Sequence, residues 1–249
     1  MQIGSGAHEA SRIAAAADLA RRMAARLDGV FIGPSASELS LEQASGARAT
    51  FERAADSSHV KTQWSVLEPD VGAWIARASK ADLIIAPGEA PDSLEGGAPY
   101  PVLEPGCLAQ VSHRPVLVLA GAKTYRPIGR CVLVAWDESP EAWRALHAAM
   151  PLLKAAETVW VMSVGDRMRS PSAADRALED HLCAQGVVPM MVWRCAQSAA
   201  RAIIVEAGQC GADLIVMNTG AWRQVSEMTR NASGRTRAFR ANWPTLIAH

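Results

Sequence analysis

The stretch GADLIVMNTGAWRQVSEMTRNASG, residues 211–234, contains the residues most able to do chemistry. It begins as an apolar run, Ala212 to Met217, typical of a buried strand, and continues into a polar segment where many α/β proteins hold a phosphate. A phosphate loop needs glycine at fixed positions, because a backbone without Cβ can turn its N–H groups onto the oxygens at close range. Glycine is scarce and displaced here, so the stretch fits either a working nucleotide site or the remains of one.

Asp137 is the second candidate. It directly follows RCVLVAW, residues 130–136, an apolar run typical of a parallel strand that is covered on both faces. The preceding Trp136 could stack on a base or fill the core. Five arginines between positions 223 and 240 could either hold an anionic ligand or form a solvated helix face.

No other pattern predicts catalysis or a metal site. The five cysteines are scattered and form no C-x-x-C pair, which is typical of reduced thiols. The six histidines show no H-x-x-x-H spacing, so we expect no metal. A complete P-loop and a G-x-S-x-G motif are both missing, and we assign no catalytic residue.

Composition and charge exclude several classes of partner. The 249 residues carry 25 basic and 25 acidic side chains, so bulk charge favours neither nucleic acid nor an anionic membrane. No apolar run approaches the ~18 residues that span a bilayer. The beginning, MQIGSGAHEA, lacks the pattern of a secretory signal. We therefore expect a soluble, cytoplasmic protein with no nucleic-acid and no membrane partner.

The chain resembles itself. KADLIIAPGE at 80–89 matches GADLIVMNTG at 211–220, and SHRPVLVLAG at 112–121 matches ANWPTLIAH at 241–249. Self-similarity on this scale predicts two copies of one supersecondary design.

Each copy alternates strands and helices. In the second copy, Ser139 and Pro140 mark the beginning of a helix whose apolar side chains recur at i, i+3, i+4 and i+7. The other elements predicted for this copy are strands at 130–136, 158–164, 187–193, 213–217 and 245–248 and helices at 172–185 and about 198–210. Such alternation predicts an open parallel sheet with right-handed crossovers.

The two copies are placed at residues 1–121 and 129–249, and glycine and proline mark a linker at 122–128. The first copy begins almost at once with a predicted helix at 7–27, which leaves only Gln2–Ile3 for its opening strand.

Two tandem α/β units with these sequences resemble a tandem universal stress protein. The resemblance rests on VLVAWDESPEAWRAL after the linker, GADLIVM before the polar segment and PTLIAH at the end. It implies an α/β fold of two doubly wound, five-stranded parallel sheets of the adenine nucleotide α-hydrolase type, with strand order 3-2-1-4-5. The first copy would lack most of its first strand. Open sheets of this kind bind ligands where the strand order reverses, outside the carboxyl ends of the strands.

The same resemblance implies an adenine-nucleotide site in the second copy. Asp137 takes the position that meets the adenosine, Ala135 and Val164 match positions that line the adenine, and Met217 precedes the phosphate loop. In ATP-binding members this loop reads Gly, two residues, Gly, nine residues, then Gly-Ser or Gly-Thr. At and beside those loop positions the chain has Asn218, Ala221, Asn231, Ala232 and Ser233. We therefore predict a vestigial or weak ATP site.

The first copy predicts no such site. Pro87 lacks a backbone N–H donor, and the carboxylates that follow it would repel a triphosphate. The expected role is that of a universal stress protein without enzymatic activity, in stress response or regulation, with no certain cofactor and ATP as the ligand to test. An ATP-binding switch with slow hydrolysis is the first alternative, and a small-molecule enzyme that uses a cleft between the copies is the second.

The resemblance also implies how the copies associate. In the family, the last strands of two units pair across a two-fold axis, so residues 115–120 should lie near 244–249 and form an internal pseudo-dimer. The same apolar interface could support a further homodimer. The sequence does not identify the protein partner.

Overall fold

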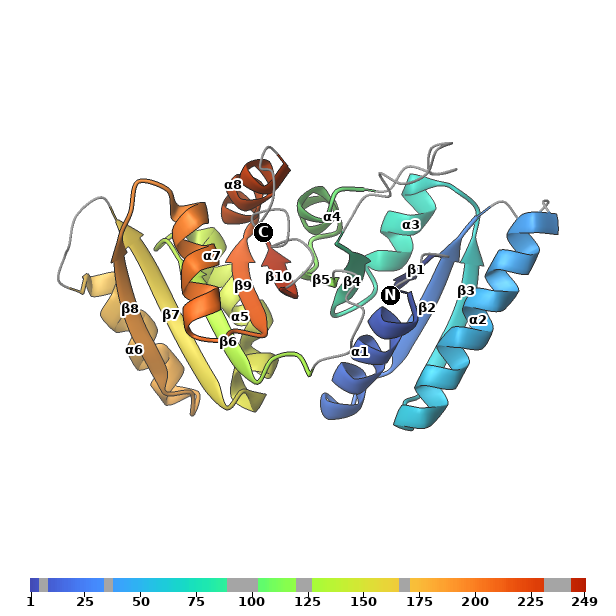
Figure 1. Ribbon diagram of the computed structural model, residues 1–249, viewed down its shortest axis with the longest axis horizontal. Coiled ribbons are helices and arrows are strands. Elements are labelled where there is room, and N and C mark those ends of the chain that lie inside the picture. Colours follow the sequence, from blue (N-terminus) through green and yellow to red (C-terminus); the bar gives the residue numbers. More distant parts are fainter. Residues whose placement is uncertain (5–8, 34–37, 89–102, 120–126, 166–170, 231–242) are drawn as a thin grey trace. The chain divides into compact units, whose positions relative to one another are not determined.

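The computed structural model divides the chain into two compact units, Met1–Pro127 and Ile128–His249. The boundary lies within the predicted linker at 122–128, and each unit alternates strands and helices (Figure 1). The structure describes residues 1–4, 9–33, 38–88, 103–119, 127–165, 171–230 and 243–249.

The second unit is built on parallel strands in the order β10-β9-β6-β7-β8. Numbered within the unit and read from the other edge, this is the predicted order 3-2-1-4-5. Its strands are β6 (Cys131–Trp136), β7 (Thr158–Gly165), β8 (Pro189–Cys195), β9 (Leu214–Asn218) and β10 (Thr245–Ala248). The two central strands β6 and β9 are almost completely buried, as expected of parallel strands with helices on both faces.

Four helices cover this sheet. They are α5 (Pro140–Ala155), α6 (Ala173–Ala184), α7 (Ala199–Gln209) and α8 (Thr219–Arg230). Helices α5 and α6 share one face and touch through Trp143 and His181, whereas α7 and α8 pack together on the other face (Figure 1). Serine side chains cap α5, α6 and α7, each accepting a hydrogen bond from a backbone N–H in the first turn.

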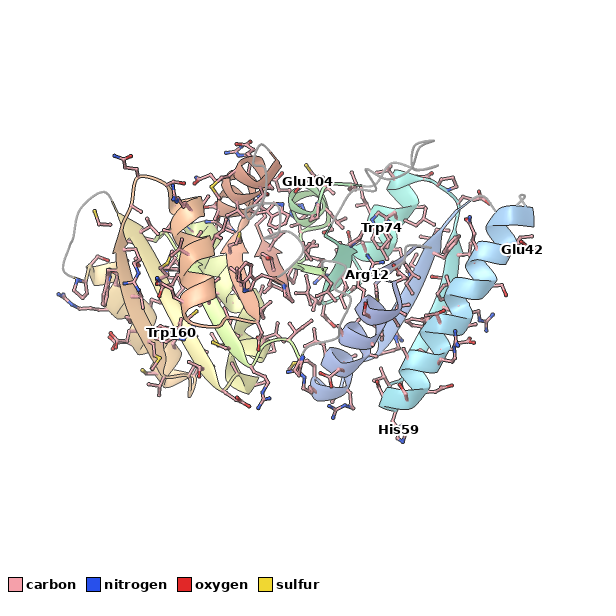
Figure 2. All side chains as sticks on the ribbon, in the orientation of Figure 1. Arg12, Glu42, His59, Trp74, Glu104 and Trp160 are labelled. Carbon is pink, nitrogen blue, oxygen red and sulfur yellow. The ribbon has the colours of Figure 1, made fainter. Side chains whose placement is uncertain are left out.

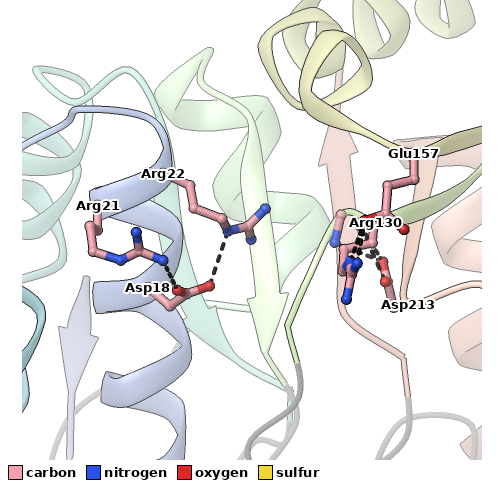
Figure 3. A network of polar contacts seen from close by, with 7 residues as sticks. Asp18, Arg21, Arg22, Arg130, Glu157 and Asp213 are labelled. Atoms are coloured by element: carbon pink, nitrogen blue, oxygen red, sulfur yellow. Dashed lines mark hydrogen bonds and ion pairs between the residues drawn. The ribbon is translucent and has the colours of Figure 1, made fainter.

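Asp213 fixes the beginning of β6. Its carboxylate accepts hydrogen bonds from the backbone N–H groups of Gly129, Arg130 and Cys131, at 2.7, 3.0 and 3.2 Å (Figure 3). The Arg130 side chain meanwhile pairs with exposed Glu157, with a distance of 2.7 Å from Nε to Oε1. The repeated Ala-Asp-Leu-Ile motif therefore has an architectural role in this unit.

The first unit has two parallel groups of strands. One group is β1 (Gln2–Ile3), β2 (Leu27–Ile32) and β3 (Thr62–Leu67), and the other is β4 (Ile84–Pro87) and β5 (Val116–Leu119). Strand β1 contacts β4, but among the described residues of this unit no ladder of hydrogen bonds joins the two. The resemblance implied one continuous five-stranded sheet here. A strand of two residues pairs with β2 and is too short to sustain a ladder on its other edge as well.

The helices of the first unit are α1 (Glu9–Arg22), α2 (Glu38–Ser58), α3 (Val71–Ala78) and α4 (Pro105–Ser112). Helix α1 is shorter than the predicted 7–27, because the chain turns at Ala24, which has a left-handed φ of 50°, and then enters β2. None of the helices in the described ranges combines the length and the apolar character needed to cross a membrane.

Candidate functional site

The site positions of the second copy come from three neighbouring strands. Ala135 lies near the carboxyl end of β6, Val164 near that of β7, and Met217 near that of β9. The strand order reverses between β6 and β9, so Asp137 and Asn218 follow these two strands at the point where open sheets bind ligands. The structure thus brings together the five site positions that precede the polar segment.

Helix α8 begins where the phosphate loop was expected. Buried Asn218 caps this helix: its Oδ1 accepts a hydrogen bond of 2.7 Å from the N–H of Ala221, in the third helical position. No residue from 218 to 230 has a positive φ. The expectation of a loop with left-handed turns is therefore wrong for this segment, and the Cβ of Ala221 causes no backbone strain.

The sequence contained a signal for this helix. Four side chains of α8 recur at i, i+3, i+4 and i+7 and are buried, namely Trp222, Val225, Ser226 and Thr229. Two of them are polar, and their hydroxyls donate to carbonyl groups of the preceding turn, which is why the apolar pattern alone is weak.

The carboxylate of Asp137 is bound by groups of the chain itself. Its Oδ2 accepts a hydrogen bond of 2.8 Å from Nδ2 of Asn218. Its Oδ1 accepts bonds from the N–H and the hydroxyl of Ser139, at 3.1 and 2.5 Å. Ser139 and Asn218 are the residues that cap α5 and α8, so the carboxylate lies between the amino ends of two helices. Negative charge is stabilised there, and Asp137 takes the place that an anionic ligand would favour.

The backbone beside this carboxylate is strained. Glu138 has a φ of 65°, a left-handed conformation that costs a residue with a Cβ about 1 kcal/mol. Such strain persists only where the surrounding structure imposes it, and the hydrogen bonds from Ser139 to Asp137 close this turn.

The apolar site positions are largely covered. Met217 is fully buried and Ala135 nearly so, whereas Val164 is half-buried. Trp136 is buried too, and its indole meets Trp143 of α5 edge to face, with ring centroids 5.0 Å apart. Of the two interpretations of Trp136, stacking on a base or filling the core, the structure supports the second.

The remaining site positions lie outside the described residues. These are Asn231, Ala232 and Ser233, together with the arginines at 235, 237 and 240. Of the predicted arginine cluster, Arg223 is exposed on α8.

The corresponding edge of the first unit is closed by an ion pair. The guanidinium of Arg12 on α1 is buried, pairs with Glu9 and donates a bond of 3.2 Å to the carbonyl of Gln2 (Figure 2). Glu9 in turn accepts a bond of 3.1 Å from the N–H of Gly4, just after β1. The acidic residues predicted to repel a triphosphate after Pro87 lie at 89, 92 and 95, outside the described residues.

The described part of the chain contains no group of three or more His, Cys, Asp or Glu side chains arranged to hold a metal ion. All five cysteines are free thiols.

Replacing Asn218 tests how this site is held. We expect Asn218→Ala to lower the free energy of unfolding by about 1–2 kcal/mol, because the helix cap and the bond to Asp137 are both lost. Asn218→Ser keeps a cap acceptor without the amide donor, so its loss should be about half as large. Urea unfolding measures both. Gln224→Ala, at an exposed position of the same helix, is the control, and an equal loss for Ala and Ser would contradict the role of the bond to Asp137.

Comparison with known proteins shows the fold. A universal stress protein from Archaeoglobus fulgidus DSM 4304 superposes with a TM-score of 0.70 at 16% identity, covering 99% of this chain and 96% of that chain. A functionally unknown protein from Pseudomonas aeruginosa PAO1 gives a TM-score of 0.55 at 17% identity, covering 94% and 85% of the two chains. No protein-family model matches the sequence, and no curated protein does either.

These similarities extend over nearly the whole chain, through both units. The protein therefore has the α/β fold of the universal stress proteins, as the sequence predicted.

Proposed function

We propose that the protein is a tandem universal stress protein with a non-enzymatic, regulatory role in stress response, and that the adenine-nucleotide site of its second unit is degraded. The fold supports membership of this family. The observation that carries the second part is the bond of 2.8 Å from Asn218 to Asp137, at the position where ATP-binding members have the first glycine of their loop.

The polar groups of this edge are already used. A phosphate needs free backbone N–H donors, but the N–H of Ala221 donates to Oδ1 of Asn218. An incoming triphosphate would also meet the carboxylate of Asp137 at the amino ends of α5 and α8 and be repelled by it. Adenosine would have to displace the Asn218 amide before it could reach the same carboxylate. Each step lowers affinity for ATP.

An ATP-binding switch with slow hydrolysis is the second candidate. It is favoured by the exposure of Asp137, which keeps an acidic residue at the position that meets adenosine in the family. In that case the Asn218 amide would exchange its bond to Asp137 for a contact with the nucleotide.

ATP titration calorimetry distinguishes the two candidates. We expect no saturable heat at millimolar ATP for the wild type, and no adenine nucleotide in the mass spectrum of small molecules released from heated protein. Micromolar binding that is lost in Asp137→Ala would contradict the degraded site and support the switch. Asn218→Gly frees the carboxylate, and binding by this variant alone would identify Asn218 as the block.

The proposed role places function in contacts with another protein rather than in chemistry. Its partner would be a cytoplasmic protein or a second copy of this chain. Affinity capture with the wild type and with Asn218→Ala shows whether such contacts depend on the closed site.

A further inference from the structure

Two cysteines that are distant in sequence meet at the amino edge of the second sheet. Cys131 is the first residue of β6, and Cys210 follows the last residue of α7. The chain then enters β9 beside β6, where the N–H of Asp213 donates 2.9 Å to the carbonyl of Cys131. Both cysteines are half-buried.

The two thiols interact directly. The sulfur of Cys131 donates to the carbonyl oxygen of Cys210 at 3.3 Å, across 79 positions of sequence. Burial raises the pKa of Cys131 to about 11, and the neighbouring Cys210 raises it further by its charge and by a hydrogen bond. Burial raises the pKa of Cys210 as well, whereas the hydrogen bond from Cys131 lowers it. Cys210 is therefore the thiol of the pair that forms a thiolate first.

We propose that Cys131 and Cys210 are an oxidation site, at which a hydroperoxide converts the two thiols into an intramolecular disulfide. The thiolate of Cys210 attacks one peroxide oxygen, the O–O bond breaks, and the leaving oxygen departs as water after protonation. Cys210 is then a sulfenic acid, its sulfur oxidised by two electrons and the peroxide reduced. The sulfur of Cys131 attacks the sulfenic sulfur, the S–O bond breaks, and the second oxygen leaves as water with the proton of the Cys131 thiol.

The remaining thiols lack this arrangement. Cys107, Cys183 and Cys195 are exposed and belong to α4, α6 and β8. Among the residues that the structure describes, the hydrogen bonds of cysteine sulfur as donor join Cys131 to Cys210 and Cys210 to Ala207. An oxidant can reach the exposed thiols sooner, but a disulfide within one chain is expected from the paired ones.

The new bond would tie the end of α7 to the beginning of β6. This is the edge where the carboxylate of Asp213 already holds the backbone N–H groups of Gly129, Arg130 and Cys131 (Figure 3). The candidate nucleotide site lies at the opposite, carboxyl edge, so the oxidation site does not depend on the proposed function. A link between residues 79 positions apart restricts the unfolded chain strongly.

The test uses the full chain with Cys107→Ser, Cys183→Ser and Cys195→Ser, which removes the exposed thiols only. After hydrogen peroxide treatment we expect both remaining thiols to disappear from a thiol titration. The intact mass should fall by two hydrogen atoms, and peptide mapping should recover Cys131 joined to Cys210. The melting temperature should rise by about 5 °C or more and return on reduction.

Adding Cys210→Ser to this variant is the matched control. It should keep its mass and its melting temperature, apart from slow oxidation of the remaining Cys131. The proposal is overturned if the pair gains oxygen instead of losing hydrogen, if the disulfide joins two chains, or if both thiols survive a peroxide concentration that oxidises free cysteine.

The rate of oxidation should depend on pH. Because burial raises the pKa of both thiols, the thiolate is the minor species near neutrality, and the rate should rise about tenfold per pH unit between 7 and 9. A rate that is constant over this range would contradict attack by a Cys210 thiolate of raised pKa.

Discussion

Asp175→Ala is expected to lower the free energy of unfolding by about 3 kcal/mol, because a buried carboxylate with several partners is lost. The Asp175 side chain is 1% exposed. It accepts a bond of 2.8 Å from the N–H of Ser172 and completes the capping box of α6. It also accepts bonds from Ser163 of β7 and from the indole of Trp193 on β8, at 3.2 and 3.3 Å.

The loss is large because alanine leaves all of these donors without their acceptor. A buried donor that cannot reach water costs its full desolvation free energy, and the donors come from three different elements. The change therefore loosens α6 and both outer strands together. Urea unfolding measures the loss, and hydrogen exchange of the β7 and β8 amides assigns it to the second unit.

Asp180→Ala is the matched control, because Asp180 is exposed on the same helix and its loss should change stability by less than about 0.5 kcal/mol. Asp175→Asn keeps the size of the side chain and an acceptor oxygen, so its effect should be intermediate. Equal stability of the Asp175→Ala and Asp180→Ala proteins would show that Asp175 does not hold these elements together.

Arg194→Ala should have the second largest effect, a loss of about 2 kcal/mol, because it leaves the carboxylate of Glu206 buried and unpaired. Arg194 binds both oxygens of this carboxylate, at 2.6 and 3.0 Å. The Glu206 side chain is 4% exposed, whereas that of Arg194 is 46% exposed. The expected loss is smaller than for a fully buried pair, because solvent already screens the guanidinium.

Arg130→Ala is the control for this prediction. Arg130 and Glu157 also form an ion pair, but both side chains are more than half exposed, so the change should have little effect on unfolding. Glu206→Gln tests the reason, because it removes the buried charge and should restore part of the stability of Arg194→Ala. If the double variant is no more stable than Arg194→Ala alone, an unpaired buried charge is not the cause of the loss.

The elements of the second unit could be predicted from local patterns. The predicted strand at 130–136 is Cys131–Trp136 in the structure, and the helix predicted from Ser139 and Pro140 is Pro140–Ala155 with Ser139 as its cap. Parallel strands buried on both faces are continuous apolar runs, and serine before proline favours the beginning of a helix. These preferences act over a few residues and are visible in the sequence alone.

The candidate site was predicted only in part. The sequence placed Asp137 and Asn218 after neighbouring strands, but helix α8 was missed because two of its buried positions are serine and threonine, Ser226 and Thr229. The role of Ser139 as a donor to Asp137 was missed as well, since its cap position was explained by α5 alone.

The sequence by itself determined the succession of strands and helices, their caps and the positions that face the core, because each depends on neighbours within one or two turns. Only the tertiary structure decided which distant polar groups meet. Asn218 and Asp137 are 81 positions apart, and Cys131 and Cys210 are 79 apart. Such pairs form because parallel strands align their ends at one edge of a sheet, and the partners at that edge depend on the order of the strands rather than on any local preference.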